Sequence, residues 1–243
     1  MAKLFIVGMG PGAYEQMTLE AVRVIQKSQV VVGYHVYTDL LRDCFPDKEY
    51  LSTPMRAERE RCVLALKLAR EGRRVALVCS GDAGVYGMSG LLLSMVKDYE
   101  GVELINVPGV TAALAGAALL GAPLIHDFCL ISLSDLLTPW SLIAQRLNMA
   151  ALGDFSIVLY NPSSKKRGNH LKMACEILLK EKSPQTPCGI VTRAYRRGQS
   201  LTYYTLEELQ EAPCDMFSTV FIGNSQTRME QGKLLTPRGY KDA

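Results

Sequence analysis

The stretch that decides the fold is Cys79-Ser80-Gly81-Asp82-Ala83-Gly84-Val85-Tyr86-Gly87. The apolar run at 75–78 before it is typical of a buried strand, and residues 88–96 after it carry apolar side chains at helical spacing. The segment is therefore predicted to form a strand, a tight loop and a helix. Its glycines allow the backbone to approach a ligand closely, and Asp82 places a carboxylate where the carboxyl ends of parallel strands form a crevice. We expect a small molecule to bind here, although such glycines can also serve the turn alone.

Two more predicted strands in the first half of the chain end in turns of the same kind. The run 4–7 leads into Gly8-Met9-Gly10-Pro11-Gly12-Ala13, and the run 102–107, expected to be buried, leads into Pro108-Gly109-Val110-Thr111-Ala112. Each turn is followed by a segment with helical character. Ligands of open α/β sheets bind at the carboxyl ends of the strands, so three such turns together indicate a binding site better than any one of them does.

The first turn also fits the pattern G-x-G-x-x-[GA] of dinucleotide-binding proteins. That function requires an acidic residue at the end of the second strand, where it binds the ribose. The strand at 30–32 is followed by no carboxylate before Asp39, and Pro11 has no amide proton for a pyrophosphate. An NAD-dependent oxidoreductase therefore remains an alternative that lacks its acidic residue.

Length and composition are those of a soluble globular protein. The chain has 243 residues, enough for two domains, with 48% hydrophobic and 21% charged residues. A net charge of +3 is too small to indicate nucleic-acid binding but is compatible with an acidic ligand. Seven scattered cysteines without C-x-x-C spacing predict reduced thiols, no metal site and a cytoplasmic protein. The longest uncharged run, 110–125, is too short for a membrane span, so no membrane partner is expected.

The helical run after the third turn stops near Gly121-Ala122-Pro123, which places a domain boundary there. The predicted domains are an N-terminal α/β domain at 1–121 and a C-terminal α/β domain at 122–243. In the first of them, Thr53 and Pro54 are expected to begin a helix over 56–71. The second is expected to form a five-stranded sheet from the segments 128–133, 155–160, 187–192, 200–205 and 218–223.

Taken together, these motifs resemble those of the tetrapyrrole methylases, which use S-adenosylmethionine. The motifs that carry the resemblance, in chain order, are Gly8-x-Gly10-Pro11-Gly12, Ser80-Gly81-Asp82, Pro108-Gly109-Val110-Thr111-Ala112, Tyr160-Asn161-Pro162, Thr192-Arg193-Ala194 and Phe221-Ile222-Gly223. They cover essentially the whole chain. Within the family, the segments 81–87 and 131–140 are most similar to the C17-methyltransferases of cobalamin synthesis, which act on precorrin-3B or cobalt-factor III. Sibling enzymes that methylate C20 or C11 are the alternatives.

The resemblance implies two α/β domains, a cofactor in the cleft between them, and a homodimer. It also implies a set of residues around S-adenosylmethionine and its product S-adenosylhomocysteine: Pro11, Ser80, Gly81, Asp82, Val85, Thr111, Ala112, Tyr160, Asn161, Ala194 and Thr219. One position departs from the family, because many members have proline where this chain has Ala83.

The resemblance further implies that methylation is coupled to contraction of the macrocycle, which needs proton transfers by a placed acid or base. The candidates are Asp135 and Ser134 after the segment 128–133 and His126, with Asp127 beside it, before that segment. Only one end of the strand can face the cleft, and Ser134 could instead cap the following helix. Basic residues after strand ends are expected to bind the carboxylates of the substrate, and the candidates are Arg193, Lys166 and Arg167.

Overall fold

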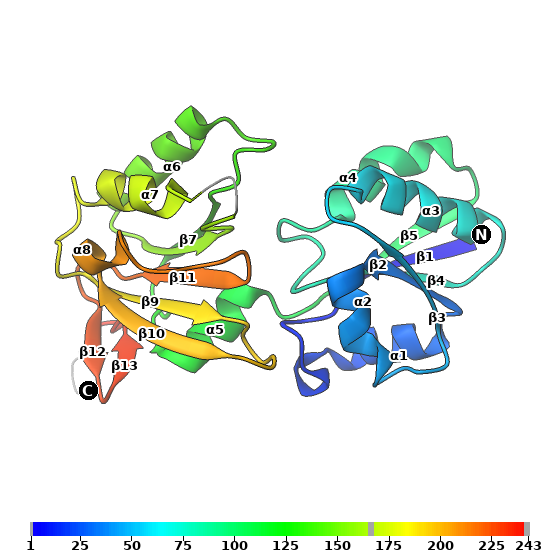
Figure 1. Ribbon diagram of the computed structural model, residues 1–243, viewed down its shortest axis with the longest axis horizontal. Coiled ribbons are helices and arrows are strands. Elements are labelled where there is room, and N and C mark those ends of the chain that lie inside the picture. Colours follow the sequence, from blue (N-terminus) through cyan, green and yellow to red (C-terminus); the bar gives the residue numbers. More distant parts are fainter. Residues whose placement is uncertain (1, 165–167, 241–243) are drawn as a thin grey trace. The chain divides into compact units, whose positions relative to one another are not determined.

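The computed structural model describes residues 2–164 and 168–240, which fall into two compact units, Met1–Ala112 and Ala113–Ala243 (Figure 1). Each unit contains a five-stranded sheet. The expected α/β class with two α/β units is confirmed. None of the helices in the described part of the chain has both the length and the apolar character needed to cross a membrane.

The first unit is a fully parallel sheet with strand order β3-β2-β4-β1-β5. Its strands are β1 Ala2–Gly8, β2 Val30–Tyr34, β3 Glu49–Thr53, β4 Val75–Cys79 and β5 Val102–Val107. Its helices are α1 Leu19–Lys27, α2 His35–Arg42, α3 Glu58–Arg70 and α4 Ser89–Met95. Apolar side chains of α1 and α2 pack on one face of the sheet, and those of α3 and α4 pack on the other.

Four features of the first unit differ from the expectations. The strand β3 and the helix α2 were not expected, and β5 is an edge strand whose residues 103–106 are partly or fully exposed. Thr53 does not cap a helix, because it is paired with Tyr34 as the last residue of β3. Its hydroxyl accepts a hydrogen bond of 2.7 Å from the buried Arg61, and α3 begins only at Glu58.

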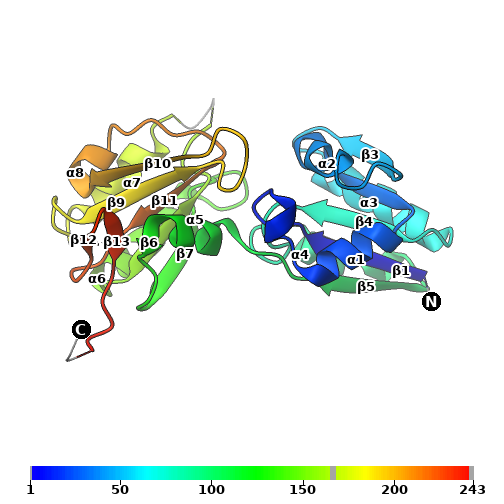
Figure 2. The same ribbon diagram turned by 90° about the horizontal axis from the view of Figure 1, so that it is seen from below.

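The second unit is a mixed sheet with strand order β10-β9-β11-β8-β7. The five predicted strands are confirmed as β7 Phe128–Ser132, β8 Ser156–Tyr160, β9 Pro187–Thr192, β10 Ser200–Thr205 and β11 Ser218–Ile222. Only β7 and β8 are parallel neighbours, and the other pairs are antiparallel. A small sheet of β6 Gly121–Ala122, β12 Arg228–Glu230 and β13 Lys233–Leu235 was not expected; Figure 2 shows β6 beside β13.

The helices of the second unit are α5 Ala112–Leu120, α6 Trp140–Leu152, α7 His170–Leu178 and α8 Leu206–Leu209. α5 covers one face of the sheet and the other three pack on the opposite face. Gly116 of α5 lies so close to Phe221 that a Cβ would stand 2.6 Å from its ring. Because α5 packs on this sheet, the units divide between Ala112 and Ala113, rather than between Gly121 and Ala122 as the end of the helical run suggested.

Candidate functional site

The three glycine-bearing turns of the first unit meet at one edge of its sheet. β1 lies between β4 and β5, and all three run parallel, so their carboxyl ends are neighbours. The turns after β1 and β4 are joined directly, since Gly10 N donates to Gly81 O at 3.1 Å and Gly81 N donates to Gly10 O at 2.8 Å. The convergence that the sequence predicted is therefore present in this unit.

Asp82 fastens the β4 turn to the β5 turn. One carboxylate oxygen accepts a hydrogen bond from Gly84 N at 2.7 Å, and the other accepts one from Gly109 N at 2.9 Å. Both oxygens are thus engaged by backbone amides, and the half-buried side chain shapes the loops. Asp82 lies where it was expected, with a supporting role that the sequence did not indicate.

The glycines of these turns serve two purposes. A Cβ on Gly8 would lie 2.7 Å from Gly81 O, and one on Gly109 would lie 2.2 Å from the same oxygen, so both glycines allow backbone to pack on backbone. Gly81 differs. Its φ is +66°, and a Cβ there would meet Thr111 Cα at 3.5 Å and Ala112 N at 3.6 Å, ordinary contact distances. Beside Gly81 there is room for a small group.

The residues around this space fit the cofactor that the sequence predicts. Thr111 and Ala112 are half-buried beside Gly81, and Ser80 and Val85 are half-buried on the same loop. They offer a hydroxyl group, backbone amides and carbonyls, and small apolar side chains. Such neutral groups can bind the amino-acid and nucleoside parts of S-adenosylmethionine by hydrogen bonds and shape.

The first glycine turn is not built for a dinucleotide. A pyrophosphate binds where the glycine turn opens directly into a helix. Here a short 3₁₀ helix at Tyr14–Gln16 follows the turn, and α1 begins only after its N-cap Thr18. Gly10 is needed for packing against this segment, because a Cβ would lie 2.7 Å from Gln16 O.

The candidate residues of the second unit also share one edge of their sheet. β7 and β8 end side by side at Ser132 and Tyr160. β9 runs in the same direction as β8 and ends at Thr192, which is paired with Ser218 at the start of antiparallel β11. The turns after three strands and the first residues of a fourth therefore lie together.

Tyr160 and Asn161 have structural contacts at this edge. The Tyr160 hydroxyl accepts a hydrogen bond of 2.7 Å from Ala113 N and so caps the first turn of α5. Asn161 has a φ of +54°, and its side-chain amide donates to the Ser132 hydroxyl at 2.9 Å. Asparagine tolerates this backbone conformation better than most residues. Thr219 is buried, and Ala194 is half-buried against the core cluster that contains α5.

Asp135 lies in the loop after β7, and its neighbour is a histidine that the sequence did not single out. The Asp135 carboxylate is 3.6 Å from Nε2 of His170, the first residue of α7. The imidazole of His170 stacks on Trp140, with ring centroids 4.8 Å apart and planes inclined by 29°. The only sequence signal for His170 was its place at the start of a helix after a strand end.

His126 lies away from Asp135 and Ser134. It precedes β7, whereas they follow it, and five strand residues span about 17 Å at roughly 3.3 Å each. Its Nδ1 accepts a hydrogen bond of 2.9 Å from the Asp127 amide. As expected for candidates at the two ends of one strand, His126 does not share a site with Asp135 and Ser134, which lie at the carboxyl end of β7.

Arg193 follows β9 at the shared edge, with a φ of +52°. Its guanidinium lies 3.5 Å from the Asp215 carboxylate and over the ring of Phe217, at 5.5 Å from the centroid. Lys166 and Arg167 lie outside the described residues.

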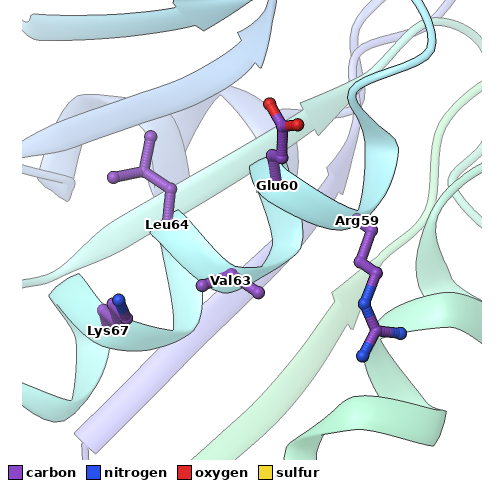
Figure 3. Close-up of a pocket in the computed structure, with 5 residues that line it drawn as sticks. All are labelled: Arg59, Glu60, Val63, Leu64 and Lys67. Carbon is purple, nitrogen blue, oxygen red and sulfur yellow. The ribbon is translucent and has the colours of Figure 1, made fainter.

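A surface hollow lies elsewhere, along the outer side of α3 (Figure 3). Its lining residues are Arg59, Glu60, Val63, Leu64 and Lys67. They form one stripe of a single helix, and none belongs to the glycine-bearing turns. The hollow is therefore not part of the candidate site.

Known proteins match this chain over nearly its whole length. The profile of the Tetrapyrrole (Corrin/Porphyrin) Methylases matches residues 3–210. A Salmonella typhimurium protein named a probable cobalt-factor III C(17)-methyltransferase is 48% identical over 98% of this chain and 99% of its own length. A precorrin-3B C(17)-methyltransferase of Sinorhizobium sp is 38% identical over 99% of this chain and 98% of its own. The crystal structure of the methyltransferase CobJ has a TM-score of 0.90, with 35% identity, and covers 98% of this chain and 100% of that one.

Proposed function

Because this chain belongs to the tetrapyrrole methylase family, we propose that it methylates C17 of cobalt-factor III or precorrin-3B and contracts the macrocycle during cobalamin synthesis. The observation that carries this proposal is the 48% identity to the Salmonella protein over nearly the full length of both chains. The same relative favours cobalt-factor III over precorrin-3B, for which the named Sinorhizobium relative is 38% identical.

The cofactor in this proposal is S-adenosylmethionine. When bound, it supplies a methyl group made electrophilic by the attached sulfonium. In the first unit, Gly81, Thr111 and Ala112 would border it, with Asp82 holding the loops in place. The further positions proposed for cofactor binding are Pro11, Ser80, Val85, Tyr160, Asn161, Ala194 and Thr219.

Methyl transfer to an electron-rich ring carbon needs no protein nucleophile, so the proposed role of these residues is alignment. Well-oriented reactants reach effective molarities on the order of 10⁵ M or more. Ring contraction also needs a proton donor or acceptor, and we assign this to Asp135, with Ser134 beside it. His126 is left out because it lies at the other end of β7.

The substrate is a polycarboxylate, and we propose that Arg193 binds one of its carboxylates with help from Lys166 and Arg167. Arg193 faces Asp215 at 3.5 Å, so binding would exchange one carboxylate partner for another. Cobalt would arrive inside the substrate. No group of three or more metal-ligating side chains occurs among residues 2–164 and 168–240. A cytoplasmic homodimer is also part of the proposal and is tested by light scattering and cell fractionation.

The decisive experiment is anaerobic incubation of the protein with S-adenosylmethionine labelled in its methyl group and with each candidate substrate. We expect one labelled methyl per macrocycle at C17, located by NMR, and loss of C20 from the ring. A methyl at C20 or C11 would identify a sibling enzyme. Binding of NADH without binding of S-adenosylhomocysteine would instead favour an oxidoreductase.

A further inference from the structure

His170 contacts the Asp135 carboxylate and itself stacks on Trp140. Each is the first residue of a helix, Trp140 of α6 and His170 of α7, and both helices pack on the same face of the second sheet. The His170 side chain is only 13% exposed, whereas that of Asp135 is 40% exposed. The imidazole is thus held by its surroundings while the carboxylate keeps access to solvent.

The loop that carries Asp135 has little apolar packing of its own. The two residues that follow, Leu136 and Leu137, are 62% and 99% exposed. The buried Leu133 lies before Asp135, and the half-buried Trp140 begins the next helix. Apolar burial therefore does not fix the Asp135 side chain, and the contact at 3.6 Å to His170 connects it to the helical layer.

We infer that His170 is a positioning residue that holds the Asp135 carboxylate toward the carboxyl edge of the second sheet. Stacking on Trp140 sets the plane of the imidazole, and Nε2 then faces the carboxylate. The inference rests on the proposed function in one respect, that Asp135 acts on the substrate. A misplacement of a catalytic group by about 1 Å can lower a rate by about a hundredfold, so such a support has a kinetic consequence.

The alternative role of this contact is to hold the loop after β7 against the start of α7 without any kinetic effect. A partly exposed contact of this kind contributes little to the stability of the fold. The two roles predict different effects of substitution. Loss of a purely structural contact would lower the stability of the fold, whereas loss of a positioning residue would slow one chemical step in a folded protein.

Two substitutions of His170 separate the effect of its ring nitrogen from the effect of its stacking on Trp140. His170→Phe keeps an aromatic ring against Trp140 but removes the nitrogen that faces Asp135, whereas His170→Gln keeps a donor and removes the stack. Lys172→Gln is the matched control. Lys172 also lies on α7, and the substitution breaks its exposed ion pair with Glu211, at 2.6 Å. Far-ultraviolet circular dichroism and thermal unfolding check that each variant is folded.

In the wild-type protein and each variant, methyl transfer is followed by label, contraction by NMR of C20, and binding of S-adenosylhomocysteine by calorimetry. We expect contraction to fall about tenfold to a hundredfold in His170→Phe and less in His170→Gln. Methyl transfer, cofactor affinity and the Lys172→Gln control should stay within about twofold of wild type. Contraction at the wild-type rate in His170→Phe, or a parallel loss of all three readouts with lowered thermal stability, would overturn the inference.

A second measurement decides the matter even if the wild-type protein methylates neither substrate, which would refute the proposed function alone. Backbone hydrogen exchange over residues 133–139 is compared between the wild-type protein and His170→Phe. Faster exchange confined to this segment supports the part of the inference that His170 holds the Asp135 loop, and unchanged exchange overturns the inference.

Discussion

Three glycines in the turns of the first unit differ in which atoms lie where a Cβ would be. At Gly8 and Gly109 the space is filled by backbone of neighbouring turns, at 2.7 Å and 2.2 Å from a Cβ. At Gly81 the nearest atoms stand 3.5 Å away. The first two glycines are therefore required by the packing of neighbouring backbone, and the third by its φ of +66°.

Alanine substitutions should separate these two requirements. Gly109→Ala is expected to destabilise the protein by about 3 kcal/mol, because its methyl group would overlap a carbonyl oxygen. Gly81→Ala should destabilise it by only about 1–2 kcal/mol, the energy of a left-handed alanine, yet weaken S-adenosylhomocysteine binding about tenfold or more. Thermal unfolding and calorimetry measure the two effects. Wild-type affinity in Gly81→Ala would show that the cofactor does not approach this residue.

Asp82 is expected to act through the loops it fastens. Removing the carboxylate in Asp82→Ala leaves the amides of Gly84 and Gly109 without a charged acceptor, and each such hydrogen bond contributes about 1.5–3 kcal/mol. We expect lower stability together with affinity for S-adenosylhomocysteine about tenfold weaker. Asp82→Asn keeps one acceptor oxygen and should lie between wild type and alanine. The exposed Asp98→Asn serves as control, and unchanged affinity in Asp82→Ala would remove Asp82 from the site.

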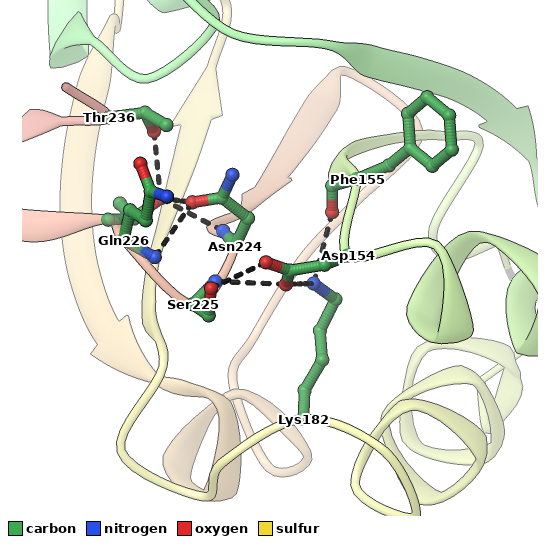
Figure 4. A network of polar contacts seen from close by, with 8 residues as sticks. Asp154, Phe155, Lys182, Asn224, Ser225, Gln226 and Thr236 are labelled. Carbon is green, nitrogen blue, oxygen red and sulfur yellow. Dashed lines mark hydrogen bonds and ion pairs between the residues drawn. The ribbon is translucent and has the colours of Figure 1, made fainter. Parts of the chain in front are cut away.

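A polar network connects three elements at the other edge of the second sheet (Figure 4). Asp154, just before β8, has a φ of +50° and accepts hydrogen bonds from the amide and hydroxyl of Ser225, which follows β11. The buried Lys182, after α7, lies 3.3 Å from the Asp154 carboxylate and donates to Phe155 O at 3.0 Å. Burial raises the pKa of Asp154, but the Ser225 hydrogen bonds and the Lys182 charge outweigh it, so the pKa lies below its usual value.

This lowered pKa predicts how the network depends on pH. A carboxylate whose pKa is lower in the folded state stabilises it above the unfolded pKa of about 3.9, and that stability is lost as the pH falls through the folded value. Asp154→Asn tolerates the same backbone conformation without the charge. Because the Asp154 side chain is 45% exposed, we expect the Asp154→Asn variant to be less stable than the wild-type protein by only about 1 kcal/mol at pH 7. The difference should shrink below about pH 4 in urea unfolding, and a difference independent of pH would contradict this account.

The elements that sequence patterns failed to predict are those fixed by tertiary pairing. β3 is a five-residue edge segment with no continuous apolar run and no regular alternation, and α2 begins at His35 without a side-chain cap. All residues of β12 are exposed, so no apolar run marks it. Buried central strands such as β4 and β8 were predictable because a continuous apolar run is visible without knowledge of the partners.

The same distinction applies to the candidate sites. The strand-end turns could be located from the sequence, because parallel strands place their carboxyl ends at one edge whatever the details of packing. The Asp135–His170 contact could not, since it depends on how α6 and α7 pack. Likewise, the hydrogen bond that Asp82 accepts from Gly109 N depends on how β4 and β5 align on either side of β1. Sequence predicts which residues lie at an edge, and folding decides which of them face one another.

At the scale of the whole molecule, the cysteines test how well both units are packed. All seven are free thiols, and Cys44 is the exposed one. Burial raises the pKa of Cys79, Cys129 and Cys214 to about 11 and that of Cys62 and Cys175 to about 12. Burial raises the pKa of Cys188 further. Of these six thiols, two lie in the first unit and four in the second.

Because the thiolate is the reactive form, the six buried or half-buried thiols should not react in the folded protein at pH 8. We expect one equivalent, from Cys44, to react rapidly with a chromogenic disulfide reagent, and all seven to react after unfolding in guanidinium chloride. Cys44→Ser should abolish the rapid phase and leave the other six unchanged. A second rapid thiol in the wild-type protein would mean that one unit opens locally on the timescale of the reaction. Mass spectrometry of the labelled cysteine would then identify which of the two units opens, since the thiols with raised pKa are divided between them.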